Sequence, residues 1–120
     1  MTPEDFVKIL RNRAMNAAVA GTAALLESPP GRKPSHELVE VSEWYHKLTE
    51  QDRTILMRVL RMTSYQAVFG VLAILDGVRT VNDGYDEGTF RLSFRMGDRE
   101  WNLTASERGF LHDLISDGHD

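Results

Sequence analysis

The sequence predicts an α+β fold that is mostly helical. Apolar residues recur at helical spacing between residues 6 and 75, the period changes to two after residue 81, and a hairpin turn follows. Because helices and strands are segregated along the chain, we expect a small bundle of three main helices, a two-stranded antiparallel hairpin and a short carboxyl-terminal helix. The 120 residues are expected to form a single globular domain, 1–120.

The first helix is expected at about residues 3–27. Thr2 is a favourable N-cap, Pro3 suits the first helical position, and the two acids that follow complement the helix dipole. The segment Ser28–Gly31 contains two prolines, which disfavour helical geometry in the residue before them. This segment therefore ends the helix.

Two further helices are expected at about 36–48 and 50–77. The second of them begins at Thr49–Asp52, which resembles a capping box with Asp in place of Glu. Gly77 is expected to close it. A helix of this length invites a bend near Thr63–Ser64, so the pattern leaves the continuity of 49–79 open.

The hairpin is expected at about 89–104, and a short helix at about 105–116. Gly97–Asp98 suits a two-residue turn with glycine first, and Thr104–Glu107 reads as a capping box at the start of the helix. The turn pairs apolar with apolar and acid with base, namely Phe94 with Trp101, Leu92 with Leu103, and Arg95 with Glu100. The apolar side of the last helix consists of Phe110, Leu111, Leu114 and Ile115.

Small residues form a stripe on each of the two long helices. The first stripe contains Ala14, Ala17, Ala18, Gly21 and Ala24, and the second contains Ala67, Gly70, Ala73 and Gly77. Residues three and four apart share one helix face, and a face without bulk lets two backbones approach closely. We therefore expect the first long helix to pack on the second half of the other. A homodimer seam is the alternative.

Composition limits the classes of function. The net charge is −4, and the excess of acids lies in residues 61–120. This balance argues against broad nucleic-acid binding and permits a basic protein partner. The chain has no cysteine, which excludes disulfides and thiolate metal sites and fits a cytoplasmic protein. The apolar run 67–75 is too short for a membrane span, and the acids Glu4 and Asp5 oppose a signal peptide.

The segment 82–88 is the polar stretch that most suggests recognition. It contains three acids and one tyrosine in a loop flanked by glycines. Acids steer a basic partner, and tyrosine is favoured at interfaces. A solvated turn is the structural alternative. The predicted partner-binding residues are Asp83, Tyr85, Asp86 and Glu87, with Asp76 and Arg79 in support. Asp76 and Arg79 flank Gly77 and could instead pair as a structural cap.

Enzymatic and metal-binding readings have weaker support in the sequence. The best metal-like spacing is Glu43-x-x-His46, to which His36 and Glu40 could contribute at helical spacing, and an exposed polar ridge is the alternative. His112-Asp113 suggests a catalytic dyad, but adjacent residues on a helix point about 100° apart and need a neighbour from elsewhere. No hydrolase, P-loop or dinucleotide motif is present, and no cofactor is expected.

Three stretches carry a resemblance to a known type of protein. They are Ser42-Glu43-Trp44-Tyr45-His46, the run from Val68-Phe69-Gly70 through Leu75-Asp76-Gly77-Val78-Arg79, and Leu111-His112-Asp113-Leu114. Together they resemble small bacterial proteins of the polymorphic-toxin immunity type. This resemblance implies a cytoplasmic, non-enzymatic protein that inactivates a basic toxin domain by covering its active site. A small metal-binding helical protein or metal-dependent enzyme is the alternative function.

Overall fold

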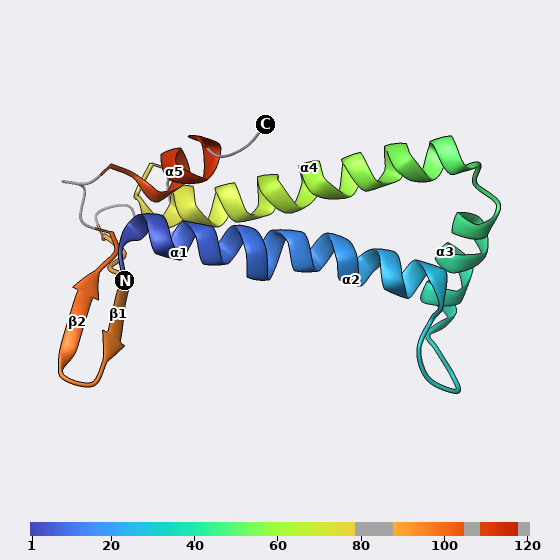
Figure 1. The fold of residues 1–120 in the computed structure, drawn as a ribbon, viewed down its shortest axis with the longest axis horizontal. Helices are drawn as coiled ribbons and strands as arrows, with labels where there is room; N and C mark the ends of the chain where they lie inside the picture. The colour runs from blue at the N-terminus through green and yellow to red at the C-terminus, as the bar shows by residue number, and fades with distance from the viewer. Residues whose placement is uncertain (79–87, 105–108, 118–120) are drawn as a thin grey trace. The chain divides into compact units, whose positions relative to one another are not determined.

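The computed structural model describes residues 1–78, 88–104 and 109–117 and confirms a mostly helical α+β fold (Figure 1). The described elements are α1 (Pro3–Leu10), the π-helical segment η1 (Arg11–Met15), α2 (Asn16–Glu27), α3 (His36–His46), α4 (Glu50–Leu75), β1 (Ser93–Met96), β2 (Arg99–Asn102) and α5 (Leu111–Asp117). The chain divides into two compact units, one containing Met1–Arg13 and Gln66–Asp120 and the other containing Ala14–Tyr65. We call them the terminal unit and the central unit. Within the described residues, no helix is long and apolar enough to cross a membrane.

The predicted helix starts are confirmed where a local cap specifies them. The Thr2 hydroxyl accepts from the Asp5 amide, and the Asp5 carboxylate accepts from the Thr2 amide, each at 3.0 Å. The latter hydrogen bond lowers the pKa of Asp5, because it favours the charged carboxylate. Ser35 caps α3 and Thr49 caps α4 through side-chain oxygens that accept amides of the first turn. The starts of these helices can be predicted from the sequence, because the donor and the acceptor of each capping hydrogen bond lie within three residues of each other.

The long helix α4 is continuous from Glu50 to Leu75 and ends as predicted at Gly77. The Val78 amide donates to the Ala73 carbonyl and the Gly77 amide to the Ile74 carbonyl, both at 3.0 Å, which is the Schellman arrangement. Gly77 has φ = 78°, a left-handed conformation that a residue with a Cβ adopts at a cost. This turn redirects the chain directly after Asp76.

The hairpin has the predicted register. Phe94 pairs with Trp101 and Arg95 with Glu100, and Gly97 takes the positive φ that the turn needs. The Phe94 and Trp101 rings contact each other at a centroid distance of 5.8 Å, and the Arg99 guanidinium lies 4.7 Å from the Trp101 ring centroid. The strands are shorter than the predicted 89–104, and the Leu103 amide donates to the Leu92 carbonyl just beyond them.

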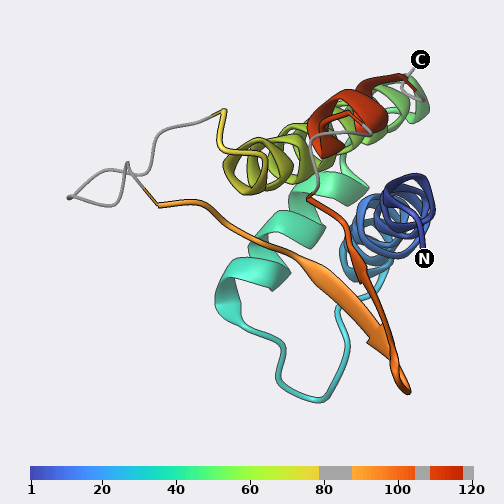
Figure 2. The same ribbon diagram turned by 90° about the vertical axis from the view of Figure 1, so that its left-hand side faces the viewer.

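The start of the last helix was predicted wrongly. The Thr104 hydroxyl accepts from the Leu92 amide and donates to the Asn102 side chain, so it serves the end of the hairpin. The rest of the predicted capping box lies outside the described residues. The helix begins instead at Leu111, where a side chain from the end of α4 accepts its first amides. In both views α5 (red) lies beside that end of α4 (yellow) (Figures 1 and 2).

The first small-residue stripe is not a buried face. Ala17, Ala18, Gly21 and Ala24 are exposed, and a Cβ added at Gly21 would meet no atom within 4 Å. The segment η1 explains the difference, because a π-helical turn takes an extra residue and rotates the helix face that follows. The more buried side of α2 runs through Val19 and Leu26, four and eleven residues after the buried Met15.

The second stripe is partly buried, in the terminal unit. Gly70 and Ala73 are buried on α4, whereas Ala67 and Gly77 are exposed. In that unit a groove lies between α1 and the second half of α4, and the α1 side chains that line it are Phe6 and Leu10. Bulky side chains, not alanines, thus line the α1 side of it.

Two glycines provide a paired prediction. Gly21→Ala is expected to raise the free energy of unfolding by about 0.5–1 kcal/mol, because alanine is the better helix former and the site is open. Gly77→Ala is expected to lower it by about 1–2 kcal/mol because of the positive φ. Urea denaturation of both variants measures the two changes. A loss of stability in Gly21→Ala would restore the close-packed seam that the sequence suggested.

Candidate functional site

A buried carboxylate holds α5 in the terminal unit. The Asp76 side chain is 2% exposed. Its Oδ1 accepts from the Leu111 amide at 3.1 Å, and its Oδ2 accepts from the His112 amide at 2.8 Å. The same Oδ2 lies 2.7 Å from Nδ1 of the His112 imidazole. Asp76 therefore caps a helix that begins 35 residues later in the chain.

The opposite end of α5 is held by a base. The Arg11 guanidinium donates to the Ile115 carbonyl at 2.9 Å. An acid at the amino-terminal end and a base at the carboxyl-terminal end both match the helix dipole. Leu111 and Ile115, 1% and 0% exposed, complete the attachment as buried apolar residues. A helix this short depends on such contacts, because it is marginal by itself.

The surroundings of His112 determine what its imidazole can do. The ring stacks on Phe110 and meets Phe69 edge-on, with centroid distances of 5.5 Å in both cases. Its Nε2 lies 3.3 Å from Oδ1 of Asp113, so the expectation that these neighbours cannot approach was wrong in this first helical turn. The predicted need for a neighbour from elsewhere is met by Asp76.

The Asp76–His112 pair resembles the orienting half of a catalytic dyad, in which a carboxylate fixes the tautomer of an imidazole. The hydroxyl of Ser116 donates to the backbone carbonyl of His112 at 3.0 Å. The arrangement is suited to fixing α5 in place.

The structure gives Asp76 a structural role. The sequence suggested either a supporting role in partner binding or a structural cap, and the Asp76 carboxylate is buried against α5. Its predicted pairing with Arg79 lies outside the described residues. The other predicted partner-binding residues lie outside the described residues; they are Arg79, Asp83, Tyr85, Asp86 and Glu87. Asp76 thus belongs to the packing of the terminal unit.

The four candidate metal ligands of the central unit do not form a metal site. His36, Glu40, Glu43 and His46 are exposed, and no group of three or more His, Asp or Glu side chains suited to a metal ion is found within residues 1–78, 88–104 and 109–117. Nε2 of His46 lies 2.9 Å from the Glu27 carbonyl oxygen, at the end of α2. The imidazole is therefore engaged with an unpaired helix-end carbonyl.

Hydrogen bonds from side chains of α3 to the last residues of α2 hold the central unit together. The Ser42 hydroxyl donates to the Leu26 carbonyl at 2.7 Å, and the Tyr45 hydroxyl donates to the Glu27 carboxylate at 2.9 Å. The latter bond raises the pKa of Tyr45, because it favours the neutral phenol. Arg53 of α4 donates to the Tyr45 carbonyl, and its guanidinium lies 4.6 Å from the Tyr45 ring centroid.

An apolar groove lies between α1 and α4 in the terminal unit. It has a volume of about 290 Å³ and is lined by Phe6, Leu10, Ala67, Val68, Val71, Leu72 and Leu75. No lining residue is charged, and Val71 is 57% exposed. On the same stretch of chain, Ile74 and Val78 are also exposed. Helical periodicity alone does not show which apolar faces of α4 remain uncovered.

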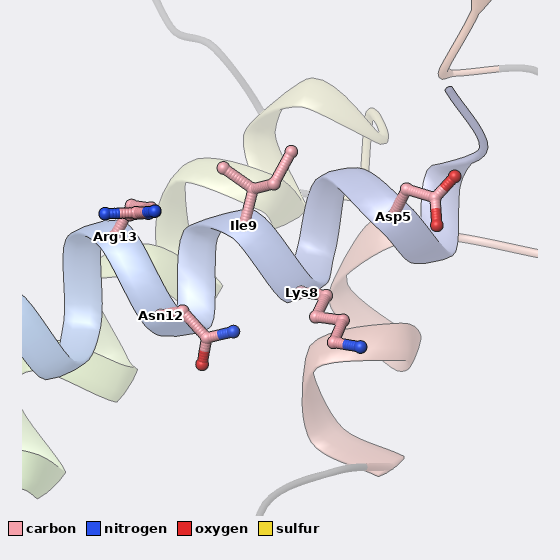
Figure 3. A pocket seen from close by; sticks show the side chains of 5 residues that line it. All are labelled: Asp5, Lys8, Ile9, Asn12 and Arg13. Carbon is pink, nitrogen blue, oxygen red and sulfur yellow. The ribbon is translucent and has the colours of Figure 1, made fainter.

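A second depression lies on α1 and η1. It has a volume of about 310 Å³ and is lined by Asp5, Lys8, Ile9, Asn12 and Arg13. Figure 3 shows these side chains projecting from one stretch of helix without converging on a common point. The Asp5 carboxylate is already engaged with the Thr2 amide. Mixed charges on an open surface provide no defined ligand chemistry.

The apolar groove is therefore a candidate binding site with a uniform lining, whereas the depression on α1 and η1 is not. Comparison of the chain with protein-family models, with curated proteins and with solved structures gives no match.

Proposed function

We propose that the chain is a non-enzymatic protein-binding module, and that the groove between α1 and α4 binds an apolar segment of a protein partner. The observation that carries this proposal is the groove itself, whose seven lining residues are all apolar. Contiguous apolar surface on a small domain commonly marks a site of protein interaction. A groove between two helices suits the apolar face of a partner helix.

A specific form of this function follows from the sequence resemblance. An immunity-type protein would bind a basic toxin domain in the cytoplasm and cover its active site. In this form the acidic segment with Asp83, Tyr85, Asp86 and Glu87, together with Arg79, would supply the charged contacts, while the groove supplies the apolar ones. Acids would speed association with the basic partner, and the groove would lengthen the life of the complex.

The proposal is tested by a charge placed in the groove. Val71→Glu keeps the fold, because the side chain is 57% exposed, but buries a carboxylate against any apolar ligand. Gln66→Glu, at an exposed position on the same helix, is the matched control. Affinity purification from native lysate, with quantitative mass spectrometry, should find at least one protein retained by wild type and Gln66→Glu and lost by Val71→Glu.

Identical sets of retained proteins for all three forms would reject the groove as a binding site. Light scattering of the purified chain addresses the homodimer that the sequence left open. A mass of two copies that Val71→Glu reduces to one copy would mean that a second copy occupies the groove, and would replace the proposal of a different partner.

A further inference from the structure

The helix α3 has an outer face that differs in chemistry from its inner face. Its inner side chains Ser42, Tyr45 and His46 are engaged with the end of α2. The outer face contains Glu37, Glu40, Val41 and Trp44, which follow one another at the spacing i, i+3, i+4 and i+7 and therefore share one side of the helix. We call these four residues the Trp44 face.

The apolar part of the Trp44 face is exposed. Trp44 is 49% and Val41 39% accessible to solvent. Tryptophan has a large apolar surface and is enriched among the residues that dominate binding energies at protein interfaces. The inner contacts of Ser42 and Tyr45 fix the rotation of α3, so Trp44 is held outward on a rigid helix.

The charged part of the Trp44 face is not neutralised. Glu37 and Glu40 are exposed, and within the described residues neither carboxylate forms an ion pair or a hydrogen bond with a side chain. The base that follows the helix, Lys47, forms no ion pair with them either. Two carboxylates next to an exposed indole create a surface that attracts cations and apolar groups together.

We propose that the Trp44 face binds a basic segment of a protein partner, with lysine or arginine side chains opposite Glu37 and Glu40 and an apolar contact on Trp44 and Val41. This inference rests on the proposed protein-binding function but uses a different surface from the groove. The negative charge of Glu37 and Glu40 determines which class of partner this face can bind. Nucleic acids and anionic membranes would be repelled by the carboxylates, and a second copy of the same face would place like charges against each other.

A displayed library of random peptides tests the chemistry of the occupant without a known partner. The library is selected on the folded full chain, and the selected peptides are then compared on the wild type and on the double variant Glu37→Lys/Glu40→Lys. We expect the enriched peptides to carry a net positive charge together with aromatic or aliphatic residues. The affinity of the synthesised peptides, measured by fluorescence polarisation, should fall about tenfold or more in Trp44→Ala and in the double variant.

Glu43→Lys is the control for position, because it makes one charge reversal of the same kind on the same helix, about 100° around from Trp44. It should change the affinity less than about twofold. In a Trp101→Phe background, the remaining indole at Trp44 reports contact directly, and its emission should shift to the blue when a peptide binds. Circular dichroism of each variant confirms that the helices are retained.

Three results would overturn the inference: no enrichment, enrichment of acidic or uncharged peptides, or binding that Trp44→Ala leaves unchanged. The test also separates the two surfaces. Peptides that lose affinity in Val71→Glu and keep it in Trp44→Ala would support the groove and reject the Trp44 face. Loss in Trp44→Ala alone would support the Trp44 face whatever occupies the groove.

Discussion

Ile115→Ala is expected to lower the free energy of unfolding by about 3–4 kcal/mol. Ile115 is 0% exposed, and it lies on α5 next to Leu111, which is 1% exposed. Removal of its side chain loses the transfer free energy of three carbons and leaves a cavity. The seven-residue helix has little intrinsic stability with which to resist this loss.

The matched control is Ile9→Ala in the same unit, where the side chain is 43% exposed. This change should cost less than about 1 kcal/mol, because less apolar surface is lost and alanine favours the helix. Equilibrium urea denaturation followed by circular dichroism measures both variants. Equal costs at Ile9 and Ile115 would show that α5 is not part of the hydrophobic core of the terminal unit.

Much of the fold could be predicted because its signals are local. The caps at Thr2 and Thr49 join atoms within three residues of each other, and Gly77 ends α4 through a conformation that glycine favours. The hairpin register follows from the two-residue turn at Gly97, which fixes every pair beyond it. Sequence patterns that span only a few residues determine backbone geometry without the help of tertiary contacts.

The rest could not be predicted because it depends on distant residues. The π-helical segment Arg11–Met15 changes which face of α2 is the more buried, and periodicity that assumes a regular helix assigns the wrong one. The cap of α5 is Asp76, which no local pattern connects with Leu111. Likewise, the alternation of apolar residues on α4 does not reveal that Val71 remains exposed.

The candidate sites also contain both features that local sequence predicts and features that depend on tertiary contacts. The exposure of Glu43 and the other residues of the polar ridge on α3 agrees with the structural alternative to a metal site. The outward position of Trp44 depends on the contacts that Ser42 and Tyr45 make with the end of α2, and no local pattern in the sequence reveals these contacts. Which side of an amphipathic helix meets its neighbour is a tertiary property.

Asp76→Ala is expected to lower the free energy of unfolding by about 3 kcal/mol. The substitution leaves the amides of Leu111 and His112 and the His112 ring without their acceptor, and buried donors without a partner cost about 1–3 kcal/mol each before water compensates. Asp76→Asn should cost less, about 1–2 kcal/mol, because its carbonyl oxygen retains one acceptor. Urea denaturation measures both values.

A double-mutant cycle separates the imidazole from the helix cap. Asp76→Ala and His112→Ala should show a coupling free energy of about 1–2 kcal/mol, because Oδ2 and Nδ1 lie 2.7 Å apart at a site where the carboxylate is 2% exposed. His112 and Asp113 should couple by less than about 0.5 kcal/mol, since Asp113 is 63% exposed and solvent screens the pair. Equal coupling in the two cycles would mean that Asp76 acts through the backbone amides alone, and that the imidazole is positioned by Phe69 and Phe110 rather than by the carboxylate.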